Sequence, residues 1–337
     1  MKKQLYIALT TVAFAWLLAA CSADEPVQQQ PEKELETAHL QLNSVTRAPD
    51  MGMTYADIQV YLTNPDEGVT PGKFKYMGMR TVDNVTFPEW SAEEVKLKAG
   101  TRTYHLYGFM PANIEGVTPT FNAATGTLTL AGLDVMTSQD IGIITGVKKS
   151  IAKVTPTRGL FSFEYKNTET FTYLNLLFDH LYGQLQFKFQ LGAQYSKLRK
   201  VKLKNVQVKA LKTGKVKAEI PLSPFNLNGI VFTPSTADSD QSVTLVDTDK
   251  WVTTTSELVG TVNFPIHSIF QNTFELVSTY EVYDLKDQLL STRTATNKLG
   301  AKMPRRGQKN VVDLLVEPTF LYQLSDNDLD NPTVKIQ

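Results

Sequence analysis

The segment Leu185–Leu191, LQFKFQL, alternates apolar and polar side chains at every position. Lys200–Val208, KVKLKNVQV, repeats the alternation, which slips by one residue at Asn205 and then resumes. A slip of one residue in a period of two indicates a β-bulge. Val312–Val316 alternates in the same way near the end of the chain. A period of two with one polar face is typical of antiparallel strands that bury their other face.

Turn signals separate these apolar segments, and no long segment has the periodicity of an amphipathic helix. They lie at Asn64–Gly68, Thr70–Gly72, Asn122–Gly126, Lys212–Gly214 and Asn228–Gly229. The sequence therefore predicts an all-β protein, built as two tandem antiparallel β-sandwich domains. A polar stretch over Tyr165–Thr170 gives the expected junction, with domains over residues 38–170 and 171–337.

The first residues have the pattern of a bacterial lipoprotein signal. Two lysines follow Met1, an apolar run covers Leu5–Leu18, and the run ends in Leu-Ala-Ala-Cys at Cys21. This run is too short to span a bilayer, so residues 1–20 read as an export signal. Cys21 is the only cysteine, which excludes an intramolecular disulfide, and it is the predicted site of lipidation. Residues 21–37 are rich in Glu, Gln and Pro and predict a disordered tether.

The overall charge argues against nucleic acid as a partner. Lysine and arginine number 34, aspartate and glutamate also number 34, and binding to nucleic acid needs a basic excess. One local exception is the basic stripe, ten lysines and arginines over residues 188–217 with no acidic residue among them. It indicates either a patch for an anionic ligand or the solvated face of a hairpin, with lysines that discourage edge pairing. Alternation with Val201 and Leu203 favours the hairpin.

No residues in the sequence form a recognisable catalytic, cofactor-binding or metal-binding set. The four histidines are His39, His105, His180 and His267. Asp179 precedes His180, but neighbours on a strand point to opposite faces and rarely form a dyad. The acidic segment Ser325–Asp330 resembles the start of a calcium loop, yet the glycine and glutamate that an EF-hand needs are missing. The sequence therefore predicts no enzyme, no cofactor and no metal.

Four segments together resemble the fimbrillins, the subunits of type V pili of anaerobic Gram-negative bacteria (Mfa-like and FimA-like proteins). They are Thr103–Pro111 with the preceding Trp90, Asp140–Gly146, Leu176–Phe187 and Val316–Asp326. The resemblance implies two transthyretin-like sandwiches and a lipoprotein precursor at the outer membrane that ends in an extracellular fimbrium. Its partners would be other fimbrillin subunits and an arginine-specific protease, with the lipid anchor holding the precursor to the membrane.

The resemblance also implies a route of assembly. A cut between Arg47 and Ala48 would remove residues up to 47, including a first strand over 38–47 whose inward side chains are Leu40 and Leu42. The C-terminal segment of another subunit, about residues 313–337, would then fill the vacated groove. Its candidate inward side chains are Phe320, Tyr322, Leu324, Val334 and Ile336.

Two alternatives stay open at the level of sequence. Arg305-Arg306 lies between Pro304 and Gly307, where a hairpin loop is expected, and a cut there would remove the donor segment. The chain could also be a monomeric surface lipoprotein that binds glycans through exposed aromatic side chains, for which the candidates are Trp90, Trp251 and Tyr283.

Overall fold

A computed structural model describes residues 35–46, 51, 53–210, 214–234, 240–246, 248–264, 274–299, 304–316 and 334–336. Within it, residues 36–337 form one compact unit. Apart from the 3-10 turns η2 (Tyr195–Lys197) and η3 (Leu227–Gly229), the described regular structure is all strand, which confirms the predicted all-β class. In this part of the chain no helix is long and apolar enough to cross a membrane. The predicted signal, Cys21 and most of the predicted tether lie outside the described residues.

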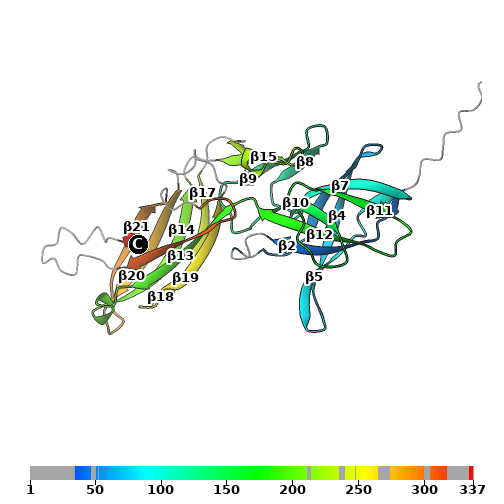
Figure 1. The fold of residues 1–337 in the computed structure, drawn as a ribbon. Helices are drawn as coiled ribbons and strands as arrows, with labels where there is room; N and C mark the ends of the chain where they lie inside the picture. Colours follow the sequence, from blue (N-terminus) through cyan, green and yellow to red (C-terminus); the bar gives the residue numbers. More distant parts are fainter. Residues whose placement is uncertain are drawn as a thin grey trace, which may run out of the picture. The chain divides into compact units, whose positions relative to one another are not determined.

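The first half of the chain builds an eight-stranded sheet (Figure 1). Its strands, in spatial order, are β2 (Leu40–Thr46), β12 (Thr172–His180), β10 (Gly142–Lys149), β7 (Thr101–Met110), β3 (Ile58–Asn64), β4 (Gly68–Val82) and β5 (Val85–Ser91). The eighth strand, β11 (Ser162–Lys166), pairs with β7. A separate two-stranded sheet joins β1 (Leu35–Thr37) to β6 (Lys96–Lys98). β12 follows residue 170 yet belongs here, so the chain leaves this sheet between His180 and Gly183.

The second half contributes two sheets that pack in a sandwich-like arrangement. One has the order β19 (Glu257–Phe264), β13 (Gly183–Leu191), β22 (Lys309–Val316) and β23 (Val334–Ile336). The other has the order β17 (Gln241–Val246), β14 (Lys200–Ala210), β20 (Phe274–Tyr283) and β21 (Leu289–Lys298), with β18 (Lys250–Val252) also paired to β14. Every second residue of β13 from Leu185 to Leu191 is buried, as the alternation predicts. The predicted bulge is confirmed as a register shift in β14 between Leu203 and Asn205.

A further four-stranded sheet draws strands from both halves of the chain. Its order is β16 (Val231–Pro234), β15 (Lys215–Pro221), β9 (Thr127–Asp134) and β8 (Thr118–Asn122). The central pair, β9 and β15, runs antiparallel from Asp134↔Lys215 to Thr127↔Pro221. The expected division of the chain at residue 170 therefore separates strands that are hydrogen-bonded to each other in this shared sheet.

Most strand pairs are antiparallel, as expected, but β2 runs parallel to β12 and β22 runs parallel to β13. Two local expectations are wrong. Thr70–Gly72 is not a turn, because it continues β4 opposite β3. β4 pairs with β5 only from Lys75 onward, so Pro71 removes no hydrogen bond between β4 and β5. The basic stripe is no hairpin, because β14 and β15 lie in different sheets.

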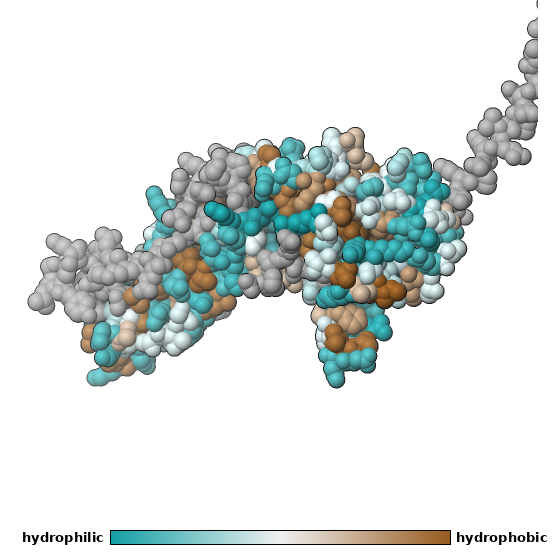
Figure 2. Space-filling view, viewed as in Figure 1, coloured by the Kyte–Doolittle hydropathy of each residue, from teal (hydrophilic) through white to brown (hydrophobic). Residues whose placement is uncertain are grey.

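The hairpin of β4 and β5 carries exposed apolar side chains towards its tip (Figure 2). They are Met77, Met79, Val82 and Val85. The turn between the strands places Asp83 and Asn84 at φ of 49° and 63°, the left-handed conformations that a two-residue type I′ turn requires.

Candidate functional site

The residues that precede β3 form the leading ribbon, which we define as residues 36–46. Its inward side chains Ala38, Leu40 and Leu42 are 3%, 4% and 8% exposed, while His39 and Gln41 face solvent. The three inward residues belong to the main cluster of buried apolar side chains. The leading ribbon therefore contributes to the core, although it precedes β3 and β4, the first antiparallel pair of the sheet.

The leading ribbon is held from two sides. The Ala38 N–H donates to the Val95 carbonyl at 2.9 Å, and Lys96 Nζ donates to Thr37 Oγ1 at 2.5 Å. Further along, β2 pairs in parallel register with β12 from Leu40↔Thr172 to Thr46↔Phe178. β2 also contacts β5, the strand at the opposite end of the same sheet (Figure 1). The ribbon thus fills the space between β12 and the β5–β6 side of the fold.

β2 is the outermost strand of its sheet, and it alone pairs with the edge of β12 that faces away from β10. Its neighbour β12 is buried along its length, with Leu174, Leu176 and Phe178 fully covered. The Thr172 N–H donates to the His39 carbonyl at 2.7 Å. Nearby, burial raises the pKa of the Tyr165 phenol, and a backbone hydrogen bond with His39 lowers it in part. Removal of the ribbon would leave these polar groups and the edge of β12 without partners.

Arg47 and Ala48 directly follow β2 but lie outside the described residues. The second arginine site, Arg305-Arg306, is described and is well anchored. It is no hairpin loop, because β22 pairs with β13 and β23, whereas β21 pairs with β20. The Gly307 N–H donates to the Tyr182 carbonyl at 2.9 Å, and the Gln308 N–H donates to the Arg305 carbonyl at 2.9 Å.

Close packing holds the same loop against β13. A Cβ on Gly183 would lie 2.5 Å from the Arg305 carbonyl oxygen, so only glycine fits at this position. Arg306 is half-buried, and burial lowers the pKa of its guanidinium, although the Asp179 charge partly opposes this. A protease needs an extended segment, and the hydrogen bonds of Gly307 and Gln308 hold this one in a turn.

The candidate donor residues are only partly described. Phe320, Tyr322 and Leu324 lie outside the described residues, whereas the backbone of Val334 and Ile336 forms β23. β23 pairs antiparallel with β22, from Leu314↔Ile336 to Val316↔Val334, and occupies the edge of its sheet. The end of the chain is thus a short edge strand that adds to a sheet through its backbone.

Asp179 and His180 point apart, as expected for neighbours on one strand. Arg158 forms an ion pair with Asp179 in which its Nε donates to Oδ2 at 2.8 Å, and Thr145 Oγ1 donates to the same oxygen at 2.6 Å. His180 Nδ1 lies 2.5 Å from Asp140 Oδ2. Sequence reasoning missed Asp140 and Arg158 as partners, since both are remote along the chain. The Thr145 contact joins β10 to β12, and the contact of His180 with Asp140 joins β12 to the residues just before β10.

Five of the ten basic residues of the stripe form ion pairs with acidic side chains in the part of the chain that the structure describes. Lys200, Lys202 and Lys204 on β14 lie 2.8, 3.3 and 2.6 Å from Asp287, Asp249 and Asp249. On β15, Lys215 pairs with Asp134 and Lys217 with Glu219. The part of the stripe on β14 and β15 is thus a solvated face whose charge is partly compensated locally.

The three candidate aromatic residues differ in exposure. Trp90 is buried, and its indole Nε1 donates to the Ala56 carbonyl at 2.9 Å, so the expectation that it is exposed is wrong. Trp251 is 43% exposed and lies 5.2 Å from Tyr283, ring centroid to ring centroid. Of the three candidates, Trp251 and Tyr283 are therefore accessible to a ligand, and Trp90 is not.

No protein-family model matches the chain, and no curated protein matches its sequence. Solved structures similar to it include a fimbrial protein from Bacteroides vulgatus, with 11% identity over 88% of this chain and 98% of that one, at a TM-score of 0.46. A fimbrial assembly protein from Parabacteroides distasonis matches with 12% identity over 90% and 100%, at 0.44. A protein from Bacteroides uniformis, provisionally described as a cell adhesion protein, matches with 13% identity over 91% and 99%, at 0.45.

Proposed function

We propose that the chain is a structural subunit of a cell-surface fimbria, exported as a lipoprotein through Cys21 and assembled by strand exchange. The observation that carries the proposal is the position of β2, a buried edge strand that is followed directly by Arg47. A cut after Arg47 by an arginine-specific protease would separate the ribbon, together with the lipid anchor, from the rest of the fold. The subunit would then function at the outer membrane and in the extracellular fibre.

The vacated edge has the features that strand addition needs. β12 would present a row of unpaired backbone N–H and C=O groups, and an added strand pairs the whole row at once. Leu40 and Leu42 would leave apolar space that alternate side chains of the incoming strand could fill. Because the row already accepts a strand in the precursor, no rearrangement of β12 is required.

The proposed donor is the C-terminal segment of a second copy or of a related subunit, over about residues 313–337. Phe320, Tyr322 and Leu324 alternate, as do Val334 and Ile336, which suits insertion of one face into a groove. A contact that joins the tail of one copy to the vacated edge of another links two different surfaces. Such heterologous contacts propagate into open chains instead of closing into dimers.

The first test is the identity of the first residue in fibres sheared from cells. The proposal expects Ala48 as the first residue of the wild-type protein, and it expects Arg47→Ala to leave an unassembled precursor that begins at Cys21. Arg305→Ala is the matched control, and it should assemble normally because the turn at Arg305-Arg306 is anchored. Assembled subunits that still begin at Cys21 would refute the processing scheme.

The second candidate function, glycan binding by a monomeric lipoprotein, is favoured by a single observation, the exposed indole of Trp251. Glycan binding at Trp251 would use no residue of β2, so one chain could assemble through the leading ribbon and also bind a glycan through this indole. Loss of fibres on deletion of residues 318–337, with a folded and exported monomer, separates the two functions.

A further inference from the structure

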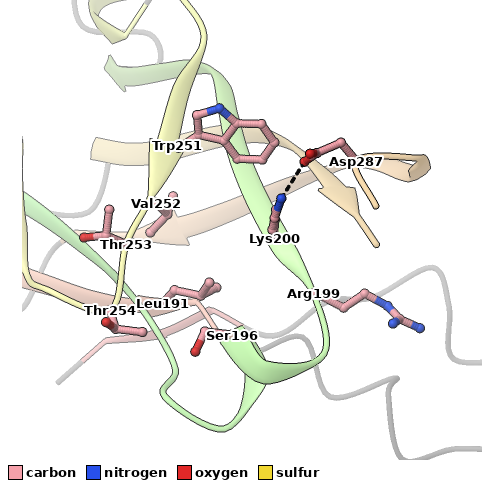
Figure 3. Close-up of a pocket in the computed structure, with 9 residues that line it drawn as sticks. All are labelled: Leu191, Ser196, Arg199, Lys200, Trp251, Val252, Thr253, Thr254 and Asp287. Carbon is pink, nitrogen blue, oxygen red and sulfur yellow. Dashed lines mark hydrogen bonds and ion pairs between the residues drawn. The ribbon is translucent and has the colours of Figure 1, made fainter. Parts of the chain in front are cut away.

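The sandwich of the second half contains a cavity of about 480 Å³ beside Trp251 (Figure 3). We propose that this cavity binds a hexopyranose unit of a glycan, stacked on the indole of Trp251. The proposal rests on the second candidate function above, and it is independent of strand exchange, because none of its residues lies in the leading ribbon or in the C-terminal segment. A volume between 300 and 1,000 Å³ is typical of small-ligand sites.

The aromatic wall is held rigidly by the strands around it. Trp251 on β18 stands opposite Lys202 on β14, and Tyr283 on β20 stands opposite Lys200, the next outward residue of β14. Lys202 Nζ lies 4.7 Å from the centroid of the indole ring and 5.1 Å from that of the phenol ring. The ammonium group therefore contacts both rings through cation–π interactions, which orients them before any ligand arrives.

Charge around Lys202 keeps this arrangement intact. Burial alone would lower the pKa of Lys202, but hydrogen bonds with Asp249 and Tyr283 raise it above its ordinary value. The Tyr283 hydroxyl donates to Glu281 Oε2 at 2.5 Å, and this contact raises the pKa of the phenol. The Lys202 ammonium group stays charged and the Tyr283 phenol stays neutral over the physiological pH range. The cation–π contact between Lys202 and the indole of Trp251 is therefore preserved.

Charged and hydroxyl side chains line the cavity together with the indole of Trp251. Lys200 Nζ lies 2.8 Å from Asp287 Oδ1, and both side chains are open to solvent at the rim (Figure 3). This pair offers a donor and an acceptor side by side, which suits neighbouring hydroxyl groups of a sugar. Ser196, Thr253 and Thr254 add hydroxyl groups, and Leu191 and Val252 supply the apolar part of the lining.

The turn that carries Asp287 is fixed by its own hydrogen bonds. Asp284 Oδ1 accepts the N–H groups of Lys286 and Gln288, each at 2.8 Å. Asp287 itself adopts φ of 66°, and its N–H donates to the Asp284 carbonyl at 3.2 Å. The carboxylate is therefore presented from an ordered turn, and little conformational entropy is lost when a ligand binds.

The chemistry of the lining selects a sugar over other ligands. One face of a pyranose ring exposes C–H groups that stack on an indole, and its edge carries hydroxyl groups that need paired donors and acceptors. Arg199 makes no ion pair among the described residues, so its charge adds an attraction for a sugar carboxylate.

The test is calorimetric titration of the full-length chain with three hexasaccharides, built of glucose, of mannose and of galacturonic acid. We expect saturable binding of at least one of them, with the third distinguishing a carboxylated from a neutral source. Trp251→Ala should weaken that binding about tenfold or more, whereas Trp251→Phe should keep most of it. Asp287→Asn should weaken binding without any change in thermal unfolding.

Phe171→Ala is the matched control, because Phe171 is 44% exposed and lies outside the cavity. It should bind as the wild type does. Absence of saturable binding to all three hexasaccharides would overturn the proposal, and so would wild-type affinity in a folded Trp251→Ala variant. Fibre formation by Trp251→Ala should be normal, so failure of this site and failure of strand exchange have different readouts.

Discussion

Replacement of Leu40 and Leu42 by alanine should destabilise the precursor and leave the fibre unchanged. The two side chains are 4% and 8% exposed, and each truncation of a buried leucine to alanine costs about 2–5 kcal/mol. Both lie on an edge strand that can partly collapse around the loss, so about 4–6 kcal/mol is expected for the pair. The proposed cut after Arg47 would remove both residues, so the same substitutions should have no effect on the processed chain.

The assay compares thermal unfolding of the precursor with thermal disassembly of fibres. The precursor is kept intact by Arg47→Ala, and in that background the double variant should melt roughly 8–15 °C lower. His39→Ala with Gln41→Ala is the matched control, because both side chains face solvent on the same ribbon. A double leucine variant no less stable than this control would refute the burial argument. Fibres that disassemble earlier in the leucine variant would show that the ribbon remains in the assembled subunit.

Three further outcomes are expected. Deletion of residues 318–337 should abolish fibres seen by electron microscopy of the cell surface while a folded monomer is still exported; normal fibres would remove the tail as donor. Arg158→Ala should lower the free energy of unfolding in urea by about 2–3 kcal/mol, because it leaves the Asp179 carboxylate buried without its ion pair, and the partial exposure of Arg158 keeps the loss below that of a fully buried pair; an unchanged transition midpoint would contradict this. Limited digestion with an arginine-specific protease should cut after Arg47 before it cuts at Arg305 or Arg306, as read by mass spectrometry of the fragments, and the reverse order would contradict the anchoring of that turn.

Alternation along the chain predicted which faces of the strands are buried. The segments around Leu185–Leu191 and Lys200–Val208 are strands with the expected inward residues, and the slip at Asn205 is a register shift. Periodicity identifies a face, however, and it does not identify a neighbour. The parallel pairing of β2 with β12 and the separation of β14 from β15 therefore could not be read from the pattern.

The candidate sites also divide into residues whose burial was expected and residues whose surroundings depend on the fold. The resemblance to fimbrillins implied Leu40 and Leu42 as inward side chains of the first strand, and both are buried. Trp90 was expected to be exposed, but its burial depends on Tyr55, Tyr76 and the Ala56 carbonyl, which the fold brings to it. The cavity at Trp251 combines β14, β18 and the turn after β20, so single-strand patterns contain no sign of it. The expectation that Trp251 is exposed was the one indication of this site at the level of sequence.

The sheet shared by β8, β9, β15 and β16 has a consequence for how this protein can be divided. A fragment that stops near residue 170 would keep the β8–β9 pair but leave β9 without β15, and the complementary fragment would leave β15 without β9. Neither piece is a self-sufficient folding unit, so heat or denaturant should melt the two halves in one cooperative transition. Chimaeras of this chain with a related one would have to swap residues 118–134 and 215–234 together.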